Sequence, residues 1–339
     1  MKPIPSFRAA HLMPYIDFLL KVGAPVERGL CRAKLPTQLR EHPDAYLPQI
    51  PTLSFLKEIS RNEGIEDFGV QVLQGLMMKD FSEPFVIAAS VSPTLKTTLD
   101  KFRELVHLED NYLSVWITAA GTTARLHIVN SFALESQDLH YEDWNEIMVL
   151  IAIVRTFAGQ TWVPEEIGLR SYIPPGRFTS EQFPNTHFVV GQDAAGITLP
   201  LELLSRPPLI QAVQMNAGDT PDLEPAIHTE SAQDFPASLK RVLAPYLGDG
   251  YPEVQLAAEL AGTSVRTLQR RLQQYNTNYS ELIKQTRFEV ASRLLRNTDE
   301  KIIDIAYELG YEDPAHFTRA FGQLTGVSPS EYRRQRCPQ

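Results

Sequence analysis

The spacing of hydrophobic and polar residues predicts two kinds of structure in the first 205 residues. Between Asn111 and Asn130, NYLSVWITAAGTTARLHIVN alternates apolar and polar positions on both sides of Gly121, which predicts a β-hairpin. Short apolar runs predict further strands in IGLRSYIP, HFVVG and GITLP. Helical periodicity predicts helices at Ser6–Val22, Thr52–Asn62, Gly64–Leu76, Pro93–Val106 and Tyr141–Phe157. We therefore expect an α+β domain here.

The pattern changes after Ser205. Ser205 to Pro236 contains five prolines and scattered polar residues without sustained periodicity, which is typical of a linker. Everything beyond it has helical periodicity. We predict an α+β domain over residues 1–205, a linker over 206–235 and an all-α domain over 236–339.

The all-α region contains an internal repeat. LAAELAGTSVRTLQRRLQQ and DIAYELGYEDPAHFTRAFGQ each place a small residue four positions before a glycine, and a second apolar helix face after it. The small residue allows two helices to cross closely, and the glycine allows a tight turn between them. The face of the second helix is Leu268 and Leu272 in one copy and Phe317 and Phe321 in the other. Each copy therefore predicts a helix-turn-helix motif.

Capping residues support these helix boundaries. Asp313 before Pro314 is a favourable N-cap, and Ser328 with Glu331 forms a capping-box pattern. Asn278 can begin a long helix between the two copies, about Asn278–Arg296. Its roughly 18 residues, at ~1.5 Å each, give a strut of about 27 Å. Such a strut can present two helices to the major groove about one DNA turn apart, roughly 34 Å.

The charge is distributed unevenly. The chain of 339 residues has a net charge of −9, yet Phe235–Gln339 holds 14 basic and 12 acidic residues, a net of +2. The residues before Phe235 hold 18 against 29, a net of −11. An acidic first part and a locally basic last part indicate an anionic partner for the last part only.

Other classes of protein find little support in the sequence. It contains no GxSxG, P-loop or HExxH motif, no GxGxxG after a strand, and eight histidines without metal-ligand spacing, so we expect neither an enzyme nor a metal or cofactor site. Cys31 and Cys337 lie at opposite ends of the chain and predict reduced thiols in a cytoplasm. We expect no signal peptide, because the first residues have no clean apolar run, and no membrane span, because no stretch approaches 18 apolar residues.

These motifs carry a family resemblance. Residues 236–336, through AGTSVRTLQRRL, YSELIKQTRFEVASRLL and IIDIAYELGYEDPAHFTRAFGQLTGVSPSEYRR, resemble the DNA-binding domain of AraC/XylS bacterial transcription regulators. Residues 1–205 resemble, through their segment order and SPTLKTTLDKFREL, the effector-sensing domain of a subgroup that includes ornithine-utilisation regulators. The resemblance implies promoter DNA, a small-molecule effector, RNA polymerase and a second copy of the chain as partners, with activation in the bacterial cytoplasm.

The candidate DNA-binding residues lie at the turn and second helix of each copy. Arginine can hydrogen-bond guanine at two atoms and glutamine can do so to adenine. The alternative is a solvated basic face. The first copy offers Thr263, Ser264, Arg266, Thr267, Gln269 and Arg270, and the second offers Asp313, Pro314, Ala315, His316, Thr318 and Arg319. Relative to the family pattern, Ala315 stands where serine is usual and Gly322 where a basic residue is usual, which favours phosphate or shape contacts for the second copy.

Some assignments stay open. Four arginines of the first domain can pair with an anionic effector or be ordinary surface charges: Arg103, Arg125, Arg170 and Arg177. The apolar face of Tyr141–Phe157 is expected in the core, and Arg333, Arg334 and Arg336 form a basic tail that can touch phosphates. The effector itself is not predicted. Two alternatives are an effector-independent dimeric regulator and a fusion to DNA-alkylation repair, for which Cys31 is the sole available thiol in the front domain.

Overall fold

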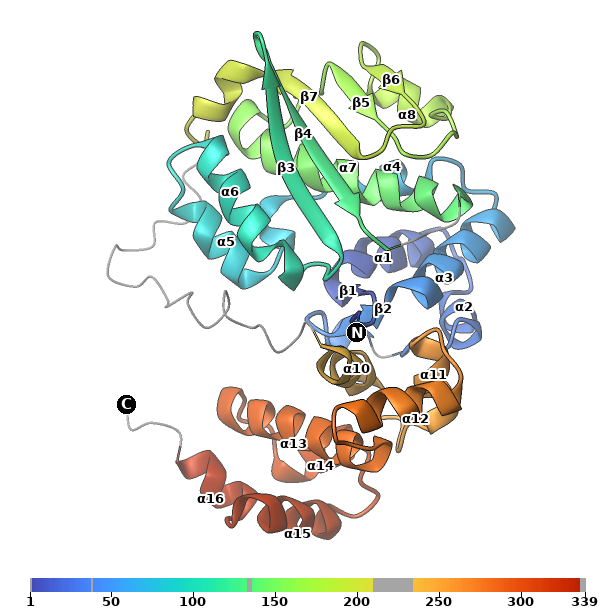
Figure 1. Ribbon diagram of the computed structural model, residues 1–339, viewed down its shortest axis with the longest axis vertical. Coiled ribbons are helices and arrows are strands. Elements are labelled where there is room, and N and C mark those ends of the chain that lie inside the picture. Colours follow the sequence, from blue (N-terminus) through green and yellow to red (C-terminus); the bar gives the residue numbers. More distant parts are fainter. Residues whose placement is uncertain (1, 38, 133–135, 210–233, 336–339) are drawn as a thin grey trace. The chain divides into compact units, whose positions relative to one another are not determined.

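The computed structural model describes residues 2–37, 39–132, 136–209 and 234–335 (Figure 1). The chain divides into two compact units, each with its own hydrophobic core. The N-terminal unit is Pro5–Glu230, and the C-terminal unit is Ser231–Gln339 together with Met1–Ile4. Most of the predicted linker falls on residues 210–233, outside the described residues.

A five-stranded sheet forms one layer of the N-terminal unit, in the order β3-β4-β7-β5-β6. All neighbours are antiparallel except β5 and β6. The predicted hairpin is confirmed, because β3 and β4 pair along their whole length around Gly121, which has a φ of +59°. The strands are β3 (Leu113–Ala120), β4 (Thr123–Asn130), β5 (Glu166–Gly168), β6 (His187–Val189) and β7 (Ala195–Pro200).

Helices cover this sheet and supply most of the core. Figure 1 shows α7 (Ser136–Ala158) against one face of the sheet, where it contacts β4 and β7. Trp144, Ile147, Met148, Ile151 and Val154 of α7 are buried, so the prediction that this helix face belongs to the core is confirmed. The other helices of the unit are α1 (Met13–Lys21), α2 (Val26–Arg32), α3 (Gln49–Asn62), α4 (Phe68–Leu73), α5 (Glu83–Ser90), α6 (Leu95–Leu105) and α8 (Arg177–Gln182).

The predicted helix at Ser6–Val22 is wrong at its start. Residues Ser6–Arg8 form strand β1, which pairs with β2 (Tyr46–Pro48), and the 3₁₀ turn η1 (Ala9–Leu12) follows before α1. This segment is a strand because it pairs with residues some forty positions away. Helical periodicity within the segment gives no information about that pairing. Just ahead of it, Ile4 is buried in the core of the C-terminal unit and its N–H donates to Ser238 Oγ at 2.9 Å.

The C-terminal unit is helical throughout its described residues, as predicted. Its core is built from apolar residues of successive helices, among them Phe235, Leu268, Leu272, Phe317 and Phe321. The helices are α10 (Phe235–Leu243), α11 (Val254–Leu260), α12 (Val265–Gln274), α13 (Tyr279–Asn297), α14 (Ile302–Glu308), α15 (Pro314–Thr325) and α16 (Pro329–Arg334). The turn η7 (Ala244–Tyr246) follows α10.

Candidate nucleic-acid interface

The first helix pair, α11 and α12, has one face in the core and one face outside. Gly262, in the turn, has a φ of +59°, a conformation that glycine adopts readily. Leu268 and Leu272 are fully buried, whereas Arg266, Gln269 and Arg270 are exposed. The apolar residues therefore fix the orientation of α12 and leave two arginines and a glutamine on its outer face.

The residues around the start of α12 hold the helix end. The Ser264 side chain accepts the Thr267 N–H at 3.3 Å and lies 3.0 Å from its hydroxyl, which makes Ser264 the N-cap. Thr263 and Thr267 are half-buried, and the Thr263 N–H donates to the Ala258 carbonyl. The Ser264 hydroxyl is exposed, so it can meet a phosphate as well as cap the helix.

The second helix pair, α14 and α15, repeats this construction. Gly310, with a φ of +73°, makes the turn, and the Asp313 side chain caps α15 by accepting the Ala315 N–H at 2.8 Å. Phe317 and Phe321 are buried. On the other face, Ala315, His316, Thr318 and Arg319 are exposed and Pro314 is half-buried.

Two exposed polar side chains near the start of α15 contact neighbouring residues of the same helix or its cap. Thr318 Oγ1 donates to the Pro314 carbonyl at 3.1 Å, and His316 Nε2 lies 3.8 Å from the Asp313 carboxylate. Among the described residues Arg319 has no such contact, and its guanidinium is exposed on this face.

Contacts within the unit separate two groups of arginines. Arg271 lies over the Phe235 ring at 5.1 Å and Arg287 over the Tyr311 ring at 4.6 Å, so both help to hold the fold. Within the described part of the chain, Arg266, Arg270 and Arg319 have no hydrogen bond or ion pair. Their guanidinium groups are therefore available to an anionic partner.

The long helix α13 connects the two pairs, as predicted. It has 19 residues, which at ~1.5 Å each is about 28 Å, and Asn278 caps it by accepting the Glu281 N–H at 3.0 Å. Tyr279 donates to the Pro252 carbonyl at 2.6 Å, just before the first pair, and Phe288 packs against Phe321 of the second. The strut is therefore anchored at both motifs.

Two of the three arginines of the basic tail, Arg333 and Arg334, lie within the described residues. Arg333 donates to the Glu300 carbonyl at 2.6 Å, and Arg334 is exposed at the end of α16. Arg336 lies outside the described residues, as does Cys337. Cys31 is an exposed free thiol on α2.

The four arginines considered for an anionic effector all face carboxylates. Arg103 lies 3.9 Å from Asp100, and Arg177 lies 2.8 Å from Glu181. Arg125 forms an ion pair with Glu166, and Arg170 is buried against Asp143 and Glu146. Each arginine already faces a carboxylate of the protein, so the structure gives no support to an anion site built from them.

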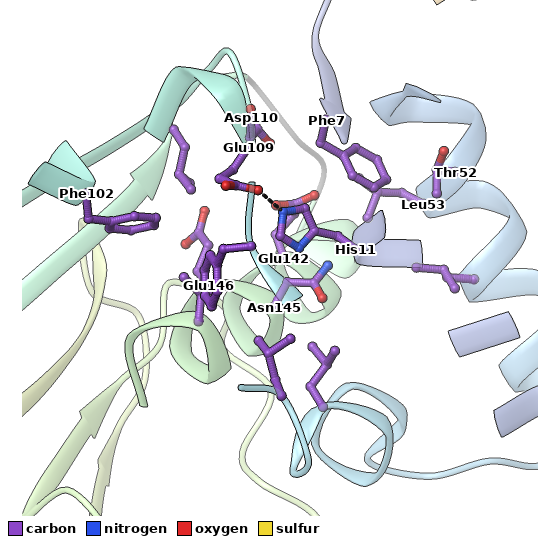
Figure 2. Close-up of a pocket in the computed structure, with 16 residues that line it drawn as sticks. Phe7, His11, Thr52, Leu53, Phe102, Glu109, Asp110, Glu142, Asn145 and Glu146 are labelled. Atoms are coloured by element: carbon purple, nitrogen blue, oxygen red, sulfur yellow. Dashed lines mark hydrogen bonds and ion pairs between the residues drawn. The ribbon is translucent and has the colours of Figure 1, made fainter. Parts of the chain in front are cut away.

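The N-terminal unit instead contains a cavity with an acidic wall (Figure 2). Residues of β1, η1, α3, α4, α6 and α7 line it, and Glu109, Asp110, Glu142 and Glu146 supply its carboxylates. The sequence interpretation missed this site. Glu142, Asn145, Glu146 and Val149 share one face of α7 at helical spacing, which was the available signal.

Burial and crowding of negative charge affect these carboxylates. Burial raises the pKa of Glu142 and of Glu146, with Arg170 opposing the rise in both. Burial, with Glu142 nearby, raises the pKa of Asp110 to about 8. Burial alone would raise the pKa of Glu109 as well, but hydrogen bonding and charge from His11 hold it below its usual value.

Two helix-turn-helix motifs are joined here by one long helix. Their outer helices carry arginines that have no hydrogen bond or ion pair among the described residues. This arrangement defines a class of DNA-binding domain. Family models agree with this class: that of a helix-turn-helix domain matches residues 257–335, and that of the N-terminal arabinose-binding domain of AraC transcription regulators matches residues 23–208. The chain belongs to the AraC family of transcription regulators.

Individual relatives match shorter stretches. The chain is 30% identical over 138 residues to the ornithine utilization regulator of Pseudomonas aeruginosa, covering 40% of each protein. It is 33% identical over 111 residues to the transcriptional activator RhaS of Enterobacter sp. (strain 638), covering 32% of this chain and 40% of RhaS. The chain thus spans less than half the length of these relatives.

Among solved structures, the transcriptional regulator CdpR from Pseudomonas aeruginosa matches 91% of this chain and 96% of its own, at 19% identity and a TM-score of 0.40. In the part of the chain that the structure describes, no helix is long and apolar enough to cross a membrane, and no group of three or more potential ligands suits a metal ion.

Proposed function

We propose that this chain is a bacterial transcription regulator that binds specific promoter sequences in double-stranded DNA. The outer face of α12 carries the proposal, because Arg266, Gln269 and Arg270 are exposed there and have no hydrogen bond or ion pair to any residue that the structure describes. Arginine can donate two hydrogen bonds to guanine and glutamine can pair with adenine in the major groove. We assign base reading to these three residues and phosphate contacts to Thr263, Ser264 and Thr267.

The second motif has a different part in this proposal. Pro314 and Ala315, at the start of α15, have no side-chain donor, and the Asp313 carboxylate is used as the helix cap. We therefore propose that α15 contributes phosphate and shape contacts through Arg319, Thr318 and His316. Such contacts position the protein on the duplex and carry little direct sequence information.

The N-terminal unit is proposed to sense a small-molecule effector and to form a homodimer. The cavity in its core supports the proposed binding of an effector, since small-molecule sites are concave and largely apolar with a few polar groups. By family membership, the DNA-bound protein would contact RNA polymerase in the cytoplasm, on the nucleoid, and activate transcription. A regulator without an effector is the second candidate.

Substitution of Arg270 tests the DNA-binding proposal. Binding sites are first selected from random duplexes with the full-length protein, and affinities are then measured on a selected and a scrambled duplex at fixed salt. Arg270→Ala should reduce the preference for the selected duplex by about 1–3 kcal/mol, or roughly 5- to 150-fold, because one base pair loses its bidentate contact. Arg177→Ala removes the same charge from the N-terminal unit and should leave the preference unchanged.

Two results would contradict parts of this assignment. An equal loss of affinity on both duplexes would show that Arg270 contacts phosphate. The slope of log affinity against log salt concentration would then decrease by about one. If the native protein selects no sequence from random duplexes at low salt, the proposed function itself is wrong.

A further inference from the structure

The cavity of the N-terminal unit combines an apolar wall with an acidic one. The space inside is about 60 Å³. Phe7, Leu53, Leu56, Phe81 and Phe102 contribute hydrocarbon surface, and Glu109, Asp110, Glu142 and Glu146 contribute carboxylates. Figure 2 shows Glu109, Glu142 and Glu146 around the same cavity as Phe102 and Leu53. No lysine or arginine is among the lining residues, and His11 is their single basic side chain.

Two of the carboxylates already have both an ion-pair partner and a backbone N–H donor in the protein. Glu109 lies 2.8 Å from His11 Nε2 and accepts the Ser82 N–H at 2.7 Å. Glu146 accepts the Asn130 N–H at 2.9 Å and lies 3.1 Å from Arg170 Nη2. Arg170 must also serve Asp143, whose side chain is fully buried at 2.8 Å from Arg170 Nε. One guanidinium thus faces two buried carboxylates.

The other two carboxylates, Asp110 and Glu142, form no ion pair with the described residues, although Arg170 acts on Glu142 from a greater distance. Asp110 accepts hydrogen bonds from the Tyr112 N–H and Asn130 Nδ2, at 2.8 and 3.0 Å. Glu142 is 6% exposed, and its Oε1 accepts Gln49 Nε2 at 2.8 Å. In the described part of the chain, Glu142 Oε2 has no donor and no ion-pair partner. A buried carboxylate without a direct ion pair is costly, so this wall favours a positively charged ligand.

We infer that the cavity binds a small primary ammonium ion on a short hydrocarbon body, with Glu142 as its principal carboxylate. This rests on the proposed role of the N-terminal unit as an effector domain. An ammonium group has three donors and no acceptor, which matches a wall of carboxylate oxygens. The hydrocarbon body packs on the phenylalanine and leucine side chains, which would not solvate a bare metal ion.

The size and charge of the cavity limit the ligand further. About 60 Å³ holds on the order of four to six water-sized groups, since each needs roughly 10–15 Å³. A carboxylate on the ligand would meet like charge and no free arginine. We therefore expect an amine with about that many heavy atoms inside the cavity and without a carboxylate.

Matched four-carbon probes test this inference on the full-length protein without DNA. Thermal unfolding and titration calorimetry are carried out with n-butylammonium, 1-butanol, butyrate, 2-aminobutyrate and Mg²⁺. We expect n-butylammonium to bind and to raise the melting temperature, with at least tenfold weaker binding of every other probe. Glu142→Gln should weaken n-butylammonium binding at least tenfold, whereas Glu181→Gln, on the exposed helix α8, should not change it.

A second variant guards against misfolding of the first. Leu53→Phe fills the cavity from α3 and keeps all carboxylates, and it should also abolish amine binding. Stronger binding of butyrate, 2-aminobutyrate or Mg²⁺, equal binding of 1-butanol, or an unchanged affinity in both cavity variants would overturn the inference. DNA selection is measured separately. If the protein selects DNA but does not bind the amine, this inference alone is wrong. If it binds the amine but selects no DNA sequence, the regulator proposal alone is wrong.

Discussion

Replacement of Gly310 by alanine tests how the second helix pair is built. Gly310 has a φ of +73°, in the left-handed region, where a residue with a Cβ costs about 1–2 kcal/mol. A Cβ there would lie 2.2 Å from the Leu247 carbonyl oxygen and 2.8 Å from that of Gly250. These are backbone atoms, so the turn or the segment after η7 must move to accommodate the methyl group.

Gly326 is a matched control in the same unit. It has a φ of +77°, and a Cβ there would meet nothing within 4 Å. Gly326→Ala should therefore cost the backbone term alone, about 1–2 kcal/mol. Gly310→Ala adds a steric term that is typically about 1–3 kcal/mol for overpacking, giving roughly 2–5 kcal/mol in total.

Scanning calorimetry of the full-length protein measures this difference. The transition of the C-terminal unit is the one that shifts when duplex DNA is added, because a ligand stabilises the unit that binds it. For a unit of about 100 residues, 1 kcal/mol corresponds to roughly 4–8 °C. Equal shifts for Gly310→Ala and Gly326→Ala would refute the steric argument, since the two positions share their backbone conformation and differ in their surroundings.

Two further predictions concern a helix cap and a buried acid. Ser328→Ala removes the side chain that accepts the Glu331 N–H in the capping box of α16, so the C-terminal unit should lose about 1 kcal/mol of unfolding free energy in denaturant titration; no loss would contradict this role. Asp110 has a pKa of about 8 in the folded chain and near 3.8 when unfolded, so the folded state holds its proton more tightly and the free energy of unfolding should fall as pH rises from about 4 to 8. Asp110→Asn should reduce that fall, as measured by thermal unfolding at pH 5 and pH 8, and an unchanged pH dependence would refute the assignment.

Much of the C-terminal unit could be predicted because its determinants are local. N-caps act over two or three residues, as Asp313 and Asn278 do, and helix faces repeat within one or two turns. The predicted exposure of Arg266, Gln269 and Arg270 and burial of Leu268 and Leu272 agree with the structure. Their contacts with DNA remain a prediction.

The N-terminal unit was harder to predict because distant segments determine its features. Strand β1 forms because Phe7 pairs with Leu47, and the cavity forms where α3, α6 and α7 bring apolar side chains around Glu142. Arg170 was considered as an effector ligand, yet Asp143, 27 positions earlier, is its partner. Local periodicity shows neither which partner a charge acquires nor which charge is left without one.

Glycine turns, caps and helical spacing act over a few residues, so the two helix-turn-helix repeats, the strut between them and the outward face of α12 follow from local sequence. Which carboxylates meet in one cavity, and which cation lies beside them, depends on long-range packing. Packing brings those groups together from across the chain, and burial there removes the water that would otherwise solvate each charge separately.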